Sequence, residues 1–238
     1  MNPKFKVSCI LPTLNEAGNI EKLIGEIQDV YKKNSFKGEI IVIDDSSPDG
    51  TWKIVQKIAK KNPNVKLIVR KVRDGAGAAT YEGYKAASGD IIVSMESDLS
   101  CNPQDIPKLV NKIEDGYDIV AASRYTKGGH TNKPLFNVLL SKSGNKFVSV
   151  LFRIKISDFT LHYRAFKRQI LKKVNPVEKD GNPFLMEFIV KAKRKGFNRI
   201  TEIPTVFRNR EYGVSKNKVL GASIRTLKAT LRIYFLNK

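Results

Sequence analysis

The sequence contains few of the residues that cross-link small proteins. Among its 238 residues are two cysteines, Cys9 and Cys101, whose spacing fits neither a disulfide framework nor a metal-ligand motif. This scarcity favours a reducing, cytoplasmic setting. Cys9 lies within an apolar strand pattern, so we expect it to be a core residue.

Long apolar runs are missing as well. No stretch approaches the roughly 20 apolar residues that crossing a bilayer requires. The first six residues lead directly into a strand pattern, and we expect no secretory signal there. Low-complexity segments and internal repeats are absent, while 41% of the residues are hydrophobic. Length and composition therefore predict a single folded domain spanning residues 1–238.

Acidic residues are scarce in the second half of the chain only. Residues 126–238 carry 25 basic and 6 acidic side chains, a net charge of +19, whereas residues 1–125 carry 18 and 17. A generally lysine-rich composition would raise both halves alike. The asymmetry indicates a polyanionic partner: nucleic acid, an anionic membrane surface or a phosphorylated substrate. The chain lacks a recognised nucleic-acid motif and interleaved surface aromatics, so we expect no nucleic-acid partner.

Short apolar runs alternate with helical periodicities in the first half. Apolar residues recur at helical spacing after each of the first four runs. Regular alternation of this kind predicts an α/β fold, with a mostly parallel central sheet and helices on both faces. The runs expected to be strands are Val7–Leu11, Ile40–Ile43, Val65–Val69, Ile91–Met95 and Ile119–Ala122.

Two glycines follow the third of these runs and precede a helical segment. Gly75 and Gly77 suggest a dinucleotide-binding loop, and Glu96 stands about 20 residues on, where such a loop expects a ribose-binding acid. The third glycine of that motif is replaced by Thr80. We therefore interpret Gly75 and Gly77 as a tight turn with close backbone approach.

Carboxylates follow two of the predicted strands. Glu96 and Asp98 stand at i and i+2 after the fourth run, so their side chains should point the same way. Asp44 and Asp45 follow the second run. Because open sheets bind ligands at the carboxyl ends of their strands, paired acids there predict a divalent cation with a phosphate ligand. The alternative is an ordinary acidic turn, which is the interpretation we prefer for Asp49 and for the cap residue Thr51.

Two segments of the second half read as basic amphipathic helices. Residues 134–156 and 220–234 place apolar residues at helical spacing among lysines and arginines. Packing against the core is the commoner role of such a stripe. Lying in a membrane interface is the alternative that the charge favours.

Seven motifs then recur in an order that resembles family 2 glycosyltransferases. The last two narrow the resemblance to dolichol- or polyprenyl-phosphate mannosyltransferases and their glucosyl relatives, over about residues 5–235. The motifs are Pro12-Thr13-Leu14-Asn15-Glu16, Asp44 to Thr51, Gly75 to Gly83, Ser88-Gly89-Asp90, Glu96-Ser97-Asp98-Leu99, Ser123-Arg124-Tyr125 and Arg210 to Lys216.

The resemblance implies a GT-A nucleotide-diphosphosugar transferase fold. It further implies inverting transfer of one sugar, with mannose from GDP-mannose ahead of other sugars, to a polyprenyl or dolichyl phosphate. Residues 1–125 would bind the nucleotide sugar, with Mg²⁺ or Mn²⁺ as cofactor, and the basic residues 126–238 would face the acceptor and an anionic membrane. Such an enzyme would associate peripherally with the cytoplasmic face of a membrane, through its amphipathic helices or a membrane-protein partner. Alternatives are a relative using UDP-glucose, another donor or a glycan acceptor, and a non-catalytic nucleotide-sugar-binding relative.

The resemblance also assigns roles to individual residues. Asp98, Arg124 and Lys216 are implied as catalytic, and Glu96 and Asp98 as metal ligands. Ser97 would join them around the donor diphosphate, and Arg210 would join Arg124 and Lys216 on phosphate oxygens. The residues implied to border the base and ribose are Pro12, Leu14, Glu16, Ile43 and Asp45. Taken singly, each has a structural alternative, such as a first-turn helix acid for Glu16 or a surface ion pair for Arg124.

Several positions depart from the family pattern. Glu96 replaces the first aspartate of the metal motif, Ser100 stands where glutamine is frequent, and Asn137 replaces an arginine of the acceptor helix. A Leu161-His162 pair replaces a small Ser-Gly pair and is expected to narrow the sugar pocket. We expect His162 to be a packing residue and His130 a loop residue.

Overall fold

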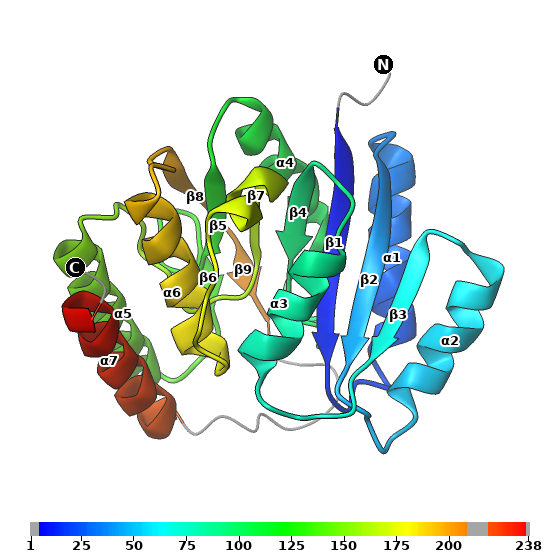
Figure 1. Cartoon of the computed structure of the whole chain (residues 1–238), viewed down its shortest axis with the longest axis horizontal. Helices are drawn as coiled ribbons and strands as arrows, with labels where there is room; N and C mark the ends of the chain where they lie inside the picture. Colours follow the sequence, from blue (N-terminus) through cyan, green and yellow to red (C-terminus); the bar gives the residue numbers. More distant parts are fainter. Residues whose placement is uncertain (1–4, 209–218, 237–238) are drawn as a thin grey trace.

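A computed structural model describes residues 5–208 and 219–236, in which a seven-stranded sheet separates two layers of helices (Figure 1). The strand order is β3-β2-β1-β4-β7-β5-β8, and β7 runs antiparallel to both of its neighbours, while the other paired strands are parallel. The strands are β1 (Lys6–Thr13), β2 (Lys37–Asp44), β3 (Val65–Val69), β4 (Ile91–Ser94), β5 (Ile119–Ser123), β7 (Arg164–Lys167) and β8 (Ile200–Pro204).

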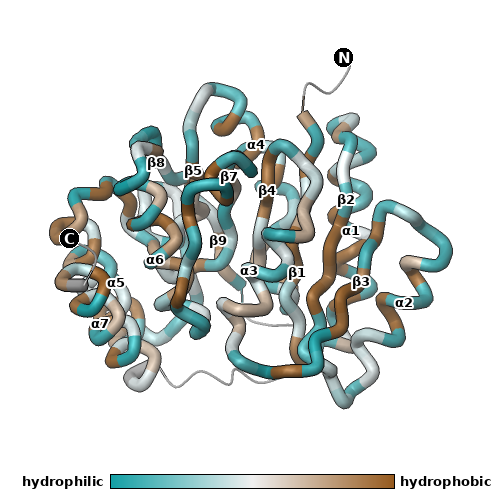
Figure 2. Tube along the Cα trace, viewed as in Figure 1, coloured by the Kyte–Doolittle hydropathy of each residue, from teal (hydrophilic) through white to brown (hydrophobic). Residues whose placement is uncertain are grey.

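Helices cover both faces of this sheet, as the alternating pattern predicts. One core contains side chains of α1 (Ile20–Lys33), α2 (Thr51–Lys61) and α4 (Ile106–Glu114). The other core contains side chains of four helices, which are α3 (Ala76–Ala86), α5 (Leu135–Phe152), α6 (Gly181–Arg194) and α7 (Val219–Leu236). Central strands appear as continuous hydrophobic segments in Figure 2, because a strand covered on both faces buries its side chains on both sides. Cys9 is fully buried in the first core, which confirms its predicted place.

The second half contributes elements that the sequence pattern did not predict. Strands β7 and β8 complete the main sheet, and β6 (His130–Thr131) pairs with β9 (Val206–Phe207) in a separate two-stranded sheet. A short 3₁₀ helix, η2 (Arg168–Lys172), follows β7, and another in the first half, η1 (Pro103–Asp105), follows β4. The insertion of β7 places β4 and β5 two positions apart, although they are consecutive long strands in the sequence.

The turn before α3 approaches another backbone closely, which confirms the interpretation of its two glycines. Gly75 has φ 121°, and a Cβ built there would lie 2.3 Å from the Lys179 carbonyl oxygen. The Gly77 N–H donates to the same carbonyl at 2.8 Å. This contact ties the start of α3 to the segment that leads into α6.

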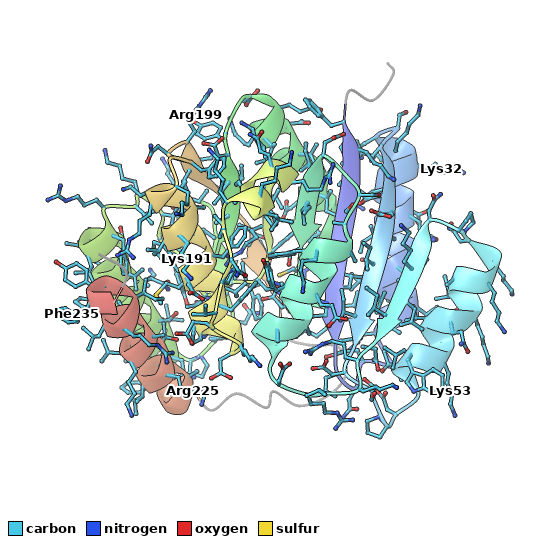
Figure 3. The ribbon with its side chains drawn as sticks, in the orientation of Figure 1. Lys32, Lys53, Lys191, Arg199, Arg225 and Phe235 are labelled. Carbon is cyan, nitrogen blue, oxygen red and sulfur yellow. The ribbon has the colours of Figure 1, made fainter. Side chains whose placement is uncertain are left out.

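Helix α7 packs through a narrower seam than its sequence pattern suggests. Ala229 and Ile233 are each 1% exposed and lie in the second core. Within the predicted apolar stripe, Ile224, Leu227 and Leu231 are 48%, 50% and 41% exposed. Helices α5 and α7 contact each other beyond α6, and Figure 3 shows Arg225 and Phe235 on that side of the molecule. Neither of these helices, nor any other in the described part of the chain, is both long and apolar enough to cross a bilayer.

Candidate functional site

The carboxyl ends of β1, β2 and β4 meet at one edge of the sheet, at the bottom of Figure 1. Each is followed by a loop in which a non-glycine residue adopts a left-handed backbone. These residues are Asn15, Ser46 and Leu99, with φ of 62°, 50° and 61°. Such conformations are uncommon outside glycine and are concentrated at functional sites. The three loops therefore mark this edge independently of any sequence motif.

The Glu96 carboxylate is held by a donor on each of its oxygens. Its Oε1 accepts from the His162 backbone N–H at 2.9 Å, and its Oε2 accepts from the Cys101 thiol at 3.2 Å. Burial and the neighbouring charge of Asp98 raise the pKa of Glu96. Asp98 is 2% exposed, and its Oδ1 accepts from the Ser100 N–H at 3.1 Å. Two carboxylates thus lie close together in a largely buried setting.

This pair fits a divalent cation that completes its coordination with phosphate and water. Across residues 5–208 and 219–236 no group of three or more acidic, histidine or cysteine side chains is arranged to enclose a metal. Mg²⁺ typically binds one or two carboxylates together with substrate phosphates. Each carboxylate oxygen has two lone pairs, and the hydrogen bonds from His162 and Cys101 use one lone pair on each oxygen of Glu96. The bound cation would also offset the repulsion that raises the pKa of Glu96.

The β1 loop reaches both neighbouring loops through hydrogen bonds. Ser97 Oγ donates to the Pro12 carbonyl at 2.9 Å, which joins the end of β4 to that of β1. Leu14 is half-buried in the same loop. Glu16 Oε2 accepts from the Asn19 side chain at 2.7 Å, just before α1. The loop that carries the predicted donor-site residues Pro12, Leu14 and Glu16 is therefore bonded directly to the segment between Glu96 and Asp98.

The turn residues Asp49 and Thr51 are structural, as we interpreted them. Asp49 Oδ1 accepts from the Thr51 N–H at 3.0 Å and from its hydroxyl at 2.6 Å. Thr51 Oγ1 in turn accepts from the Glu16 N–H at 2.9 Å. The hydroxyl therefore ties the start of α2 to the β1 loop.

Asp45 is paired with an arginine that the motifs did not identify. Arg70 Nη1 donates to Asp45 Oδ1 at 2.6 Å, and Arg70 Nε donates to Glu82 at 2.9 Å. Burial raises the pKa of Asp45, and the Arg70 guanidinium opposes that rise. Ile43, the predicted neighbour of the base, is fully buried at the end of β2. The available signal for Arg70 was its place directly after β3, the strand beside β2.

Arg124 forms a buried ion pair at the end of β5. Its Nε donates to Asp158 Oδ2 at 2.7 Å and its Nη2 to Asp158 Oδ1 at 2.9 Å. Burial alone would lower the pKa of Arg124, but the Asp158 charge outweighs it and raises the pKa. With 7% of Arg124 exposed, this is not the surface ion pair of the structural alternative. Arg210 and Lys216, predicted to act beside it, lie outside the described residues.

His162 and Arg164 are buried polar residues behind the acidic pair. Burial and the Arg164 charge lower the pKa of His162 to about 3, so its imidazole is neutral. Arg164 donates to the carbonyl oxygens of Leu161 and Leu185, each at 2.7 Å. Sequence patterns contained no signal for Arg164, because the hydrogen-bond acceptors of its Nη1 and Nη2 are backbone carbonyls, which any residue type can supply.

The chain matches a known protein family and several of its members. The model of glycosyl transferase family 2 matches residues 8–174, which include every candidate site residue except Arg210 and Lys216. A dolichol-phosphate mannosyltransferase from Pyrococcus furiosus is 38% identical over 220 residues, covering 90% of this chain and 60% of that protein. A polyprenol monophosphomannose synthase from Mycolicibacterium smegmatis is 32% identical, covering 94% of this chain and 85% of the relative.

Solved structures show the same fold. A glucosyl-3-phosphoglycerate synthase from Mycobacterium tuberculosis, solved with Mn²⁺, UDP and glucosyl-3-phosphoglycerate, superposes with a TM-score of 0.72. It is 22% identical, and the match covers 97% of this chain and 80% of that one. This likeness confirms the predicted α/β fold. The family match and the two relatives confirm the predicted family: the chain belongs to glycosyl transferase family 2.

Proposed function

We propose that the chain transfers mannose from GDP-mannose, with inversion, to a polyprenyl or dolichyl phosphate at the cytoplasmic face of a membrane. The observation that carries this proposal is the Glu96–Asp98 pair beside Asp45, at the strand ends of a family 2 chain. Relatives named for lipid-phosphate mannosyl transfer support the reaction class. The chain spans 60% of the Pyrococcus furiosus relative, and its own activity is the proposal here.

The donor nucleotide would lie across the ends of β1 and β2. Pro12, Leu14 and Glu16 would border the base and ribose from one side, and Ile43 and Asp45 from the other. Arg70 already orients the Asp45 carboxylate through a 2.6 Å contact. Asp45 would accept a hydrogen bond from a ribose hydroxyl or a base N–H, for which its ionised form is needed.

Glu96 and Asp98 would hold Mg²⁺ or Mn²⁺ against the donor diphosphate, with Ser97 beside them. The cation supplies charge stabilisation to the departing nucleoside diphosphate. Binding of Mn²⁺ with UDP by the structurally similar Mycobacterium tuberculosis enzyme supports a divalent cofactor. The hydrogen bonds that His162 and Cys101 donate to Glu96 keep its carboxylate from rotating away.

The attacking group would be an oxygen of the acceptor phosphate. It is already ionised near neutral pH, so the reaction needs no strong general base and depends mainly on positioning and electrostatics. Asp98 would orient the reacting groups. Arg124, held by Asp158, would present a fixed positive charge, and Arg210 and Lys216 would bind further phosphate oxygens.

Exposed apolar side chains on α5 and α7 support contact with the membrane that carries the acceptor. On α5 these are Leu135, Phe136, Leu139, Phe147 and Val150, and on α7 they are Ile224, Leu227, Leu231 and Phe235. A net charge of +19 in residues 126–238 complements an anionic lipid surface. Alternatively, a membrane protein would cover these exposed side chains of α5 and α7.

Transfer is tested by incubating the purified chain with radiolabelled nucleotide sugars, Mg²⁺ or Mn²⁺, and polyprenyl phosphate. The proposal expects label from GDP-mannose in the organic phase. Label from UDP-glucose would change the donor, and label only in aqueous glycan would change the acceptor. Metal-dependent nucleotide binding in calorimetry without any product would identify a non-catalytic relative.

Membrane contact is tested by exchanging apolar residues that the core does not use. Ile224→Ser with Leu227→Ser should weaken vesicle binding and leave the melting temperature nearly unchanged, since both side chains are about half exposed. The control Ile233→Ala removes a buried side chain and should lower stability by about 2–4 kcal/mol while sparing vesicle binding by folded protein. Unchanged binding by the double variant would contradict membrane contact through α7.

A further inference from the structure

A buried histidine connects two secondary-structure elements directly behind the acidic pair. His162 is 8% exposed, and its Nε2 lies 2.6 Å from Ser94 Oγ and 3.3 Å from Thr80 Oγ1. Ser94 is the last residue of β4, and Thr80 lies in the second turn of α3. The Thr80 hydroxyl donates to the Ala76 carbonyl at 2.7 Å, so its oxygen faces the imidazole as an acceptor. The ring is therefore fixed from two elements at once.

The same residue touches the metal site through its backbone. The His162 N–H donates to Glu96 Oε1 at 2.9 Å, although the two residues are 66 positions apart. Glutamate has one more rotatable bond than aspartate, so its carboxylate needs more external restraint to keep one orientation. The Cys101 thiol is a weak donor to the other oxygen, which leaves the His162 N–H as the stronger restraint.

We propose that His162 is a positioning residue. Its imidazole, held by Ser94 and Thr80, fixes its own backbone N–H, and that N–H aims the Glu96 carboxylate at the divalent cation of the donor site. The role is geometric and requires no proton transfer by the ring. This role rests on the proposed function, because it assumes that Glu96 and Asp98 hold the divalent cation. Hydrogen bonds that orient metal ligands typically contribute 10- to 100-fold to metal affinity or activity.

Mn²⁺ binding by the full-length chain in the presence of GDP, followed by electron paramagnetic resonance, tests this role without turnover. His162→Ala should weaken Mn²⁺ binding by at least about 10-fold. His162→Gln, whose amide can still reach Ser94, should recover most of that loss. Ser94→Ala should weaken binding in the same direction. The matched control is His130→Ala, because His130 is exposed and its imidazole contacts the Asn132 side chain, away from the acidic pair.

The outcomes separate this proposal from the proposed function. If folded His162→Ala binds Mn²⁺ as tightly as the wild type, the positioning role is overturned. If His162→Ala fails to fold, unchanged Mn²⁺ affinity in Ser94→Ala overturns it instead. If the variants lose Mn²⁺ affinity while the wild-type protein transfers no sugar, the positioning role stands and the proposed activity is contradicted. A wild type that binds no Mn²⁺ with GDP or UDP would overturn both. In active enzyme, the variants should raise the apparent KM for the metal more than they lower kcat.

Discussion

At the scale of single residues, the site depends on groups that fix one another. Glu96 takes its orientation from His162 and Cys101, Asp45 from Arg70, and Arg124 from Asp158. Except for the Cys101 contact, which lies within the loop after β4, each of these contacts joins segments that flank different strands. The side chains of the proposed site are therefore held in position in the free protein, as electrostatic catalysis would require.

Asp98 is the acidic residue whose removal should be most damaging. Asp98→Asn keeps the size of the side chain and removes its charge, so we expect transfer to fall by about 100-fold or more. The fold should persist, because the amide oxygen can still accept from the Ser100 N–H. The matched control is Asp115→Asn at the exposed end of α4, which should leave the rate unchanged. Full activity in Asp98→Asn would remove this residue from the mechanism.

Glu39 makes a prediction about stability and pH that is independent of catalysis. Burial raises the pKa of its carboxylate, but Lys66 at 2.6 Å and hydrogen bonds from Ser8 and Ser88 outweigh burial and lower it from 4.5 to about 2. A carboxylate with a lower pKa in the folded state stabilises the fold above its unfolded pKa. That contribution, about 3 kcal/mol for a shift of this size, is lost as the pH falls from about 4.5 to about 2.

Chemical denaturation of Glu39→Gln alongside the wild type checks this linkage. The difference in unfolding free energy should be constant above pH 5 and should shrink toward zero near pH 2. A difference that is unchanged across this range would show that the Glu39 charge is not stabilising. The same contacts give the Ser88-Gly89-Asp90 motif a structural role, since Ser88 binds Glu39 and the Gly89 N–H donates to Ser8.

At the scale of elements, α3 packs on the sheet strands that lead to the proposed donor site. A Cβ added at Gly83 would lie 2.4 Å from Ile43 Cδ1 and 2.5 Å from Ile10 Cγ2. Gly83→Ala should therefore destabilise the fold by about 1–3 kcal/mol and weaken nucleotide binding by displacing Ile43. The measurements are thermal unfolding and calorimetry with GDP.

Gly25 in α1 provides a matched control for that substitution. A Cβ there meets nothing within 4 Å, so Gly25→Ala should stabilise the helix by about 0.5–1 kcal/mol and leave GDP binding unchanged. Equal effects of the two substitutions would show that close packing at Gly83 is not what constrains α3.

Sequence patterns predicted the first five long strands but not β7 or β8, and the reason is physical. The first five contain mostly apolar runs, and all of these except the run in the edge strand β3 are buried, because helices cover both faces of the sheet. Strand β7 begins with the fully buried Arg164, and β8 contains Glu202 and ends at Pro204, so neither displays that pattern.

The same reasoning separates the site residues. Glu96 and Asp98 were predictable because they share one strand end. Arg124 and Asp158 are 34 positions apart, and no local signal indicates that the chain returns through β7 to pair them.

At the scale of the whole molecule, helices α5 and α7, with their exposed apolar side chains, lie together at one end. Helices α5 and α7 are at the far side of the molecule from α2 (Figure 1). Binding to phosphatidylglycerol vesicles should weaken as salt is raised, since the Debye length falls from about 10 Å at 0.1 M to about 3 Å at 1 M. Phosphatidylcholine vesicles should bind more weakly at every salt concentration.

Substituting lysines at two different places tests whether vesicle binding uses one face of the molecule or depends only on its net charge. Lys146→Gln with Lys228→Gln, on α5 and α7, should reduce vesicle sedimentation more than Lys57→Gln with Lys61→Gln on α2, although both pairs remove two charges and all four side chains are exposed. Equal losses from the two pairs would indicate that the surface has no preferred face.

The position of β5 between β7 and β8 also determines the order in which the molecule can assemble during synthesis. Residues 119–123, which form β5, leave the ribosome before either neighbouring strand has been synthesised. The edge of β4 that does not face β1 also stays unpaired until β7 is synthesised. Until β7 follows, the nascent chain carries one unpaired apolar strand, β5, and one open edge on β4, features that invite aggregation. Residues 1–125, the part proposed to bind the nucleotide sugar, therefore have no complete sheet of their own, and we expect a fragment ending at residue 125 to bind chaperones rather than to fold as an independent module.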